Sequence, residues 1–142
     1  MLLTAFIFIR SSKSAAVSSG ESRRIIIVLE GIVKFFLDSP PDNLQKMLTV
    51  IVRKTAHIVE FTALSCTACR IVKVYGKPLK QFFVWVLFTG LLTACVDEAI
   101  QLISDGRAGM IADVFIDFSG TLLGVCISAF VIHIHSECRK KA

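Results

Sequence analysis

The stretch that decides the fold is TACVDEAIQLISDGRAGMIADVFIDFSGTLLG, residues 93–124. It contains two apolar segments joined by a short glycine-containing connection, yet carboxylates interrupt both: Asp97 and Glu98 in the first, Asp113 and Asp117 in the second. A carboxylate at membrane depth costs roughly 2.5–3.5 kcal/mol on insertion scales, so such side chains face a protein interior or a wet cavity. The stretch therefore predicts a polar site inside a helical membrane protein.

The polar and small residues of both segments recur at intervals of three and four, which places them on one face of an α-helix. The two faces comprise Gly90, Ala94, Asp97 and Gln101, and Asp113, Asp117, Gly120 and Gly124. Each face carries polar residues towards the connecting loop and small residues farther away. Because small residues let helices approach closely in lipid, we expect Gly90, Gly120 and Gly124 to be helix-packing positions.

Composition and segment length agree with this interpretation. Of the 142 residues, 54% are hydrophobic, above the roughly 45–50% that is usual for soluble domains. The excess is concentrated in three runs, Val50 to Val74, Gln81 to Ile103 and Ile111 to Ile134, each long enough to cross a hydrocarbon core of about 30 Å. We predict one domain of the all-α membrane class, a small multi-pass bundle of about four transmembrane helices in which residues 50–134 form a three-helix core.

The N-terminal third is expected to supply the fourth span and an outward loop. Residues 1–9 are apolar but reach only half way across a bilayer, so the first span is short or truncated at its start. In the loop, residues 10–49, the Ser-rich part from Arg10 to Arg24 is predicted to be an exposed linker. The segment Ile25 to Leu37 is predicted to be an amphipathic helix lying flat in the interface, with a re-entrant segment as the alternative.

The basic residues predict the orientation. The net charge is +5, but the cations lie in loops and the tail rather than on one continuous face, which favours flanking of membrane spans over nucleic-acid binding. Four Lys or Arg between Arg70 and Lys80 and three in residues 139–141 oppose a single Arg107 in the loop before Met110. This bias places the tail, residues 135–142, in the cytoplasm and the carboxylates on the extracytoplasmic side.

The third apolar run brings further polar residues to the same leaflet. Arg53, His57 and Glu60 share one helical face at its start, level with the polar ends of the other two runs. The candidate catalytic residues are therefore His57, Glu60, Asp97, Glu98, Asp113 and Asp117, and the candidate ligand-binding residues are Arg53, Lys54, Gln101 and Arg107. An excess of acid over base in such a pocket can be relieved by protonation, by His57 or by a bound cation.

Metal binding and cysteine chemistry have weaker support. Histidine and carboxylates are suitable metal ligands, but the chain has no HExxH-like motif, and we expect no metal and no other cofactor. Cys66 and Cys69 have a CxxC spacing inside an apolar run, without a second Cys/His pair at zinc-finger spacing. We interpret the cysteines within the apolar runs as small apolar filler.

These motifs together resemble those of the VanZ-like family of bacterial membrane proteins. The resemblance rests on RKxxHxxEF from Arg53, DExxQ from Asp97, Gly106-Arg107 and DxxxDxxGxxxG from Asp113, over roughly Val50 to Phe130. It implies a multi-pass protein of the bacterial cytoplasmic membrane, in a family named for a protein that confers teicoplanin resistance, and it brings no established catalytic or ligand assignment. Members often have a histidine before the glutamine, where this chain has Ile100.

Three functional hypotheses follow. The first is a non-enzymatic envelope protein that binds a lipid headgroup, a cell-wall precursor or a glycopeptide antibiotic in an outward-facing pocket and contributes to antibiotic resistance. The second is an intramembrane hydrolase or transferase that acts on a lipid-linked substrate through His57 and the carboxylates. The third is a proton- or cation-coupled transporter, for which four helices are few unless the chain forms a homo-oligomer. The alternative to all three is an ion-paired network that only locks the helices together.

Overall fold

The computed structural model describes residues 2–12, 15–36, 41–76, 78–104 and 110–141. Within these ranges the regular elements are all α-helices: α1 (Leu2–Ser11), α2 (Ala15–Phe36), α3 (Leu44–Val74), α4 (Leu79–Ile103) and α5 (Ile111–Lys141). The predicted all-α class is confirmed.

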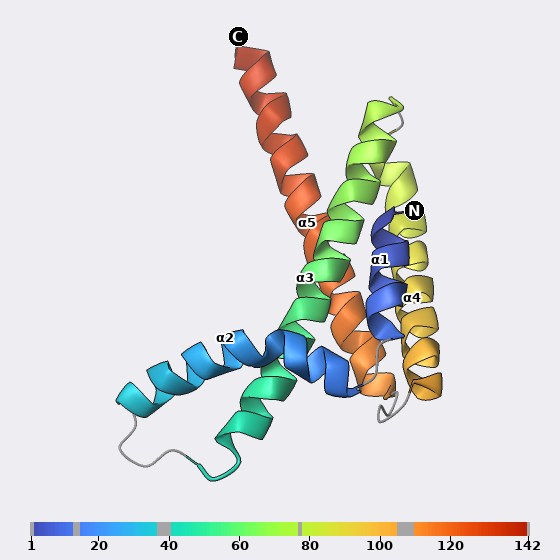
Figure 1. The fold of residues 1–142 in the computed structure, drawn as a ribbon. Coiled ribbons are helices and arrows are strands. Elements are labelled where there is room, and N and C mark those ends of the chain that lie inside the picture. The colour runs from blue at the N-terminus through green and yellow to red at the C-terminus, as the bar shows by residue number, and fades with distance from the viewer. Residues whose placement is uncertain (1, 13–14, 37–40, 77, 105–109, 142) are drawn as a thin grey trace.

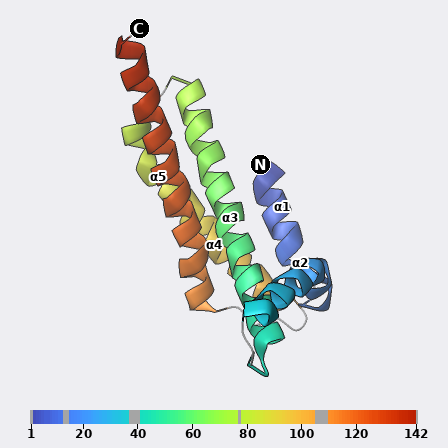
Figure 2. The ribbon, with the colours of Figure 1, turned by 90° about the vertical axis from the view of Figure 1, so that its left-hand side faces the viewer.

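Four of the helices lie side by side, and the fifth crosses them. In Figure 1, α1, α3, α4 and α5 run up and down the molecule, whereas α2 lies across the lower part of α3; Figure 2 shows the same arrangement from the side. Because α3 leads into α4 at one end and α4 leads into α5 at the other, α3 and α5 are parallel and α4 is antiparallel to both. The starts of α3 and α5 and the end of α4 therefore meet at one end of the bundle.

The closest helix contact is between α3 and α5. A Cβ atom built on Gly120 would lie 2.5 Å from the carbonyl oxygen of Ile58, and one on Gly124 would lie 2.5 Å from the carbonyl oxygen of Thr62. Neither position has room for a side chain, so both glycines are sites of backbone approach, as small residues at helix interfaces in membranes are. The single Thr62 hydroxyl proton is shared between the carbonyl of Ile58 in its own helix, at 2.7 Å, and the carbonyl of Gly120 across this contact, at 3.0 Å.

Helix α4 packs on the neighbouring side of α5. A Cβ atom on Gly90 would lie 2.6 Å from Oγ1 of Thr121, so the third predicted packing glycine also marks a close contact. Among the residues whose burial is described, two small clusters form the apolar core: Ile7, Phe61 and Ala94, and Cys69, Val86 and Val125. The core is thin because much of the apolar surface faces outward.

In the part of the chain that the structure describes, two helices are long and apolar enough to cross a membrane, Gln81–Ile103 and Ile111–Arg139. Their outer faces expose large apolar side chains, with Trp85 64%, Phe88 56% and Phe130 66% accessible. Soluble monomers rarely expose apolar patches of this extent, whereas lipid covers them in a membrane. Helix α3 has 31 residues, enough to span, but its charged residues keep it outside this composition class.

The helices extend beyond several predicted boundaries. The residues from Arg10 to Arg24 were expected to form a linker, but α1 continues to Ser11 and α2 begins at Ala15. The helix expected from Ile25 is therefore longer at its start, and Leu37, its expected end, lies outside the described residues. Buried Ile26, 4% accessible, and packing on α3 stabilise the part of α2 that was predicted, whereas the extension back to Ala15 through the Ser-rich stretch was not predicted from local propensity.

The two long helices of the three-helix core also start or end beyond the apolar runs. Helix α3 begins at Leu44 rather than Val50, and α5 continues to Lys141 through part of the expected tail. Hydropathy detects where a helix is apolar, whereas Gln, Lys and Glu are good helix formers that continue it into water. The apolar N-terminal segment, expected to be a partial span, forms the short ten-residue helix α1.

Candidate functional site

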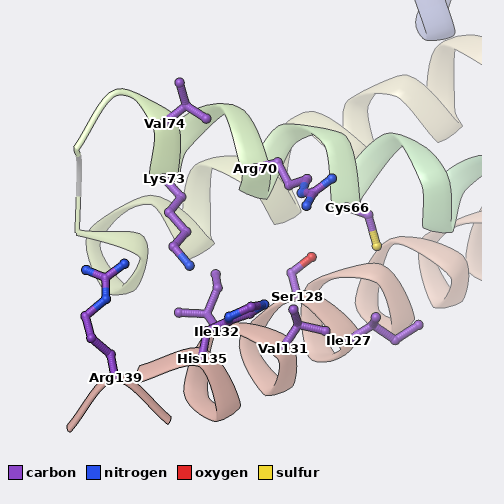
Figure 3. Close-up of a pocket in the computed structure, with 10 residues that line it drawn as sticks. All are labelled: Cys66, Arg70, Lys73, Val74, Ile127, Ser128, Val131, Ile132, His135 and Arg139. Carbon is purple, nitrogen blue, oxygen red and sulfur yellow. The ribbon is translucent and has the colours of Figure 1, made fainter. Parts of the chain in front are cut away.

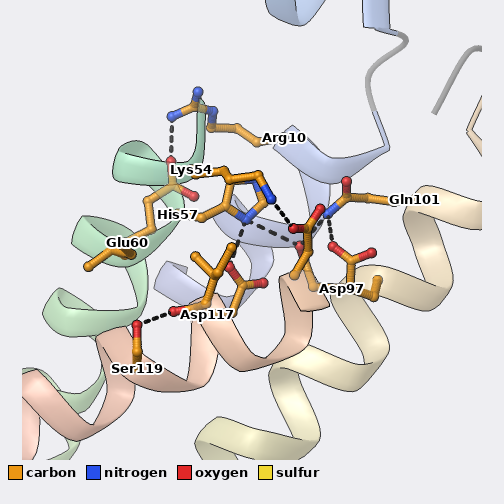
Figure 4. Close-up of polar contacts among 12 residues, drawn as sticks. Arg10, Lys54, His57, Glu60, Asp97, Gln101, Asp117 and Ser119 are labelled. Atoms are coloured by element: carbon orange, nitrogen blue, oxygen red, sulfur yellow. Dashed lines mark hydrogen bonds and ion pairs between the residues drawn. The ribbon is translucent and has the colours of Figure 1, made fainter. Parts of the chain in front are cut away.

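Polar side chains from α1, α3, α4 and α5 gather where α4 ends and α5 begins (Figure 4). His57 of α3 lies at the centre, between a carboxylate of α4 and a carboxylate of α5. Its Nδ1 atom is 3.2 Å from Oδ1 of Asp117 and 3.7 Å from Oδ2 of Asp97. Both aspartates are buried, whereas 21% of the His57 side chain is accessible. The imidazole is thus the part of this trio that solvent reaches.

The helical faces predicted from the sequence put these residues together. Asp97 and Gln101 are buried one turn apart on α4, on the same face as Gly90 and Ala94. Asp117 is one turn before the buried Gly120 on α5, so the close approach of α3 and α5 also sets the distance from His57 to Asp117. The structure thus brings His57 of α3 beside Asp97 of α4 and Asp117 of α5.

An amide and a backbone N–H support the carboxylates of α4. Nε2 of Gln101 donates to Oδ2 of Asp97 at 3.1 Å and to Oε1 of Glu98 at 2.9 Å. The N–H of Met110, immediately before α5, donates to Oε2 of Glu98 at 2.9 Å. Glu98 therefore connects the end of α4 to the start of α5 and is fully engaged in hydrogen bonds.

Two ion pairs flank the centre. Arg10 at the end of α1 pairs with Glu60 of α3, and Lys54 of α3 pairs with Asp113 of α5. The two cationic side chains are 33% and 38% accessible, so the pairs lie at the rim rather than in the interior. Each rim carboxylate has its own cation.

The inner carboxylates are less well compensated. Among the described residues, Asp97 and Asp117 have only His57 as a potential counter-charge within ion-pair distance. Oδ1 of Asp97 and Oδ2 of Asp117 are buried and have no hydrogen-bond partner. Buried carboxylate oxygens without partners are costly. A histidine beside two carboxylates can relay a proton or hold a cation, and one donor atom from each of the three residues lies within 4.8 Å of the others.

The remaining predicted residues are placed as follows. Arg53 is partly buried on α3 and makes no ion pair with a carboxylate in the described ranges. Arg107 lies outside the described residues. Ile100, at the position of the family's frequent histidine, is partly buried, and its carbonyl accepts a hydrogen bond from Ser104. The roles proposed for these residues stay predictions.

Sequence reasoning missed the contribution of α1. Arg10 was assigned to the linker, but it pairs with Glu60, and the neighbouring Ser11 is buried at 1% accessibility. The Ser11 carbonyl accepts a hydrogen bond from the Ser104 hydroxyl, which attaches α1 to the end of α4. A cation at the end of an apolar segment is the only local signal, and it does not identify the partner.

A second polar feature lies at the opposite end of the bundle. A cavity of about 820 Å³ opens between the later parts of α3 and α5, and basic side chains line its mouth (Figure 3). They are Arg70 and Lys73 of α3 and His135 and Arg139 of α5. The end of α3 and α5 away from His57 therefore carries a group of basic side chains around this cavity.

Comparison with known proteins agrees with the sequence motifs. The model of the VanZ/LLP1 family matches residues 1–132, which include α1 to α4 and most of α5. The match also includes every residue of the polar centre, which comprises His57, Asp97, Glu98, Gln101 and Asp117. No curated protein and no solved structure matches the chain significantly. Because the match covers most of the chain, the protein belongs to the VanZ/LLP1 family.

Proposed function

We propose that this chain is a multi-pass protein of the bacterial cytoplasmic membrane that binds the polar part of an amphiphile in its polar centre. In this proposal α1, α3, α4 and α5 lie within the bilayer, with α1 as a partial span, and α2 lies in the interface. The apolar outer faces of α4 and α5 support membrane insertion. Its amphiphile is a lipid headgroup, a lipid-linked wall precursor or a glycopeptide antibiotic, and binding contributes to antibiotic resistance.

The orientation proposed for the chain rests on the basic side chains around the cavity between the later parts of α3 and α5. Arg70, Lys73 and Arg139 lie at the end where α3 leads into α4 and α5 finishes. Cytoplasmic flanks of membrane spans are enriched in Lys and Arg. The basic end is therefore assigned to the cytoplasm, and the polar centre faces the leaflet in which wall precursors and glycopeptides meet.

The observation that carries the binding proposal is the polar centre itself. Four helices bring buried carboxylates and a partly accessible histidine to one end of the bundle, with Arg10 and Lys54 at the rim. Buried charges inside a membrane protein mark ligand or ion sites. Rim cations suit the anionic phosphate of a headgroup, while the exposed apolar helix faces suit its hydrocarbon chain.

The test is binding by the full chain in lipid nanodiscs. We would titrate three probes: phosphatidylglycerol, a diphosphate-linked wall precursor and teicoplanin. Lys54→Gln and Glu98→Gln should each weaken binding of the recognised probe at least about tenfold, because the first removes a rim cation and the second removes a charge from the centre. Asp42→Asn, an exposed carboxylate outside the centre, should leave it unchanged. If no probe binds, or if Asp42→Asn weakens binding as much, the proposal is wrong.

An intramembrane enzyme is the second candidate, and one observation favours it. The Nδ1 atom of His57 contacts carboxylates from two different helices, and this arrangement suits proton transfer to or from a bound substrate. Purified protein should then release phosphate or another product from the lipid-linked precursor. His57→Gln should abolish turnover while leaving precursor binding measurable, whereas a binding protein shows no turnover in either form.

A further inference from the structure

We propose that His57, Asp97 and Asp117 form a site for a divalent transition-metal ion. The inference concerns the same polar centre as the proposed function and deepens it, but it is argued from geometry and charge alone. Sequence motifs led us to expect no metal, because the three residues come from three helices with no local spacing pattern. Their arrangement in space provides the information that the sequence lacks.

The separations suit a shared metal ion. Ligand atoms about 2.0–2.1 Å from a tetrahedral zinc ion lie about 3.3 Å from one another. Nδ1 of His57 is 3.2 Å from Oδ1 of Asp117 and 3.7 Å from Oδ2 of Asp97. Donor atoms from all three residues lie within 4.8 Å of each other, so an ion can contact each of them with small side-chain adjustments.

The unpartnered oxygens are the second, independent observation. Asp97 and Asp117 are 0% and 1% accessible, and Oδ1 of Asp97 and Oδ2 of Asp117 have no hydrogen-bond partner. Carboxylate oxygens in such places are normally hydrogen-bonded, protonated or bound to a cation. The oxygens nearest Nδ1 of His57 are Oδ2 of Asp97 and Oδ1 of Asp117, so an ion shared with His57 reaches the unpartnered oxygens when each aspartate binds it through both oxygens.

The charge balance also favours a cation. Arg10 and Lys54 are already paired with Glu60 and Asp113 at the rim. With a neutral His57, the two aspartates place two negative charges in the interior, which a divalent ion neutralises. One nitrogen and two carboxylate ligands suit Zn²⁺, Mn²⁺ or Fe²⁺ better than the all-oxygen preference of Mg²⁺ or Ca²⁺.

A neighbouring side chain supports the proposed ligands, and one of the ligands is partly accessible. Gln101 donates to Asp97 and holds its carboxylate in place, as outer residues do around metal ligands. The His57 side chain is 21% accessible, so the three residues are not fully enclosed. Three protein ligands leave at least one position for water or for an anionic group of the proposed amphiphile, so the ion links the buried aspartates to headgroup recognition.

The test uses the full chain in mild detergent, with its five cysteines replaced by serine or alanine so that thiols do not compete for metal. After treatment with a chelator, the protein is dialysed against Zn²⁺ or Mn²⁺, and the metal content is measured. We expect one ion per chain. Asp97→Asn and Asp117→Asn should weaken binding at least about 100-fold, since even outer-shell changes cost 10–100-fold. Asp113→Asn, a rim carboxylate on the same helix as Asp117, is the matched control and should retain the ion.

Direct coordination has a spectroscopic signature that does not depend on affinity. In the same background, Asp117→Cys loaded with Co²⁺ should show a thiolate-to-cobalt charge-transfer absorption, which Asp113→Cys should lack. Failure of the parent chain to bind either ion overturns the proposal, and so does binding that Asp97→Asn and Asp117→Asn leave unchanged. The two proposals fail separately: metal uptake without amphiphile binding refutes only the proposed function, and amphiphile binding without metal uptake refutes only this inference.

Discussion

Replacing the glycines between α3 and α5 by alanine should destabilise the bundle, although alanine is the better helix former. At Gly120 the new Cβ would lie 2.5 Å from the carbonyl oxygen of Ile58, and at Gly124 it would lie 2.5 Å from that of Thr62. Ordinary carbon–oxygen contacts begin at about 3.3 Å, so each substitution lacks about 0.8 Å of space. The clashing atoms belong to a helix backbone and cannot rotate away, so α3 and α5 must separate.

The net effect follows from two opposing contributions. Overpacking of a close-packed contact costs about 1–3 kcal/mol, whereas glycine to alanine in a helix interior contributes about 0.5–1 kcal/mol in the stabilising direction. Separation of the helices also weakens the hydrogen bond from Thr62 to the Gly120 carbonyl. We expect Gly120→Ala and Gly124→Ala each to lower the free energy of unfolding by about 1–2 kcal/mol.

The matched control is Gly31→Ala in the middle of α2, where nothing lies within 4 Å of the added Cβ. It should have the opposite sign and stabilise the protein by up to about 1 kcal/mol. The measurement is loss of helical circular dichroism as a denaturing detergent is added to mixed micelles. If all three alanine variants shift the transition in the same direction, the close approach of α3 and α5 is refuted.

Three further predictions concern the contact between α4 and α5, the orientation in the membrane and the ion pair of Arg10. Gly90→Ala should destabilise the bundle, because the new Cβ would meet the methyl and hydroxyl groups of Thr121. Thr121→Ala removes both groups and should recover about 1 kcal/mol of that loss in the double variant, whereas additive single effects would exclude the contact. In the cysteine-free chain in intact cells, Met110→Cys should react with an impermeant thiol reagent and Tyr75→Cys should not, and the reverse pattern would invert the orientation. Arg10→Gln should lower the free energy of unfolding by about 1 kcal/mol, because it leaves the mostly buried Glu60 carboxylate unpaired. Arg10→Lys should retain most of the stability, and equal effects of the two substitutions would show that the charge of Arg10 does not stabilise the protein.

Helical spacing carried most of the information about contacts. It identified Asp117, Gly120 and Gly124 as one face of α5, and the structure places that face against α3. It also identified Asp97 and Gln101 as one face of α4, and both are buried. Such a pattern is local, because a residue's position on a helix depends only on its neighbours in sequence.

Pairing between helices was not predictable in the same way. Which of the carboxylates meets His57 depends on the rotation and register of α5 against α3. In the structure Asp117 contacts His57, and Asp113 pairs with Lys54; both residues of the second pair lie about one turn earlier on their helices. The partner of Glu60 is some 50 residues away, at the end of a helix that sequence patterns ended too early. These features arise from packing over long sequence separations, so no window along the chain contains them.

The parallel register of α3 and α5 affects how loss-of-function variants should be interpreted. Because the two helices advance together, Lys54 meets Asp113, His57 meets Asp117, and the glycine contacts follow within the next two turns. A genetic selection for inactive chains would therefore recover substitutions at regular intervals along both helices, well beyond the polar centre. Mapped on the structure, these regularly spaced positions would look like the lining of a substrate tunnel, although they only mark where the backbones of α3 and α5 are in contact.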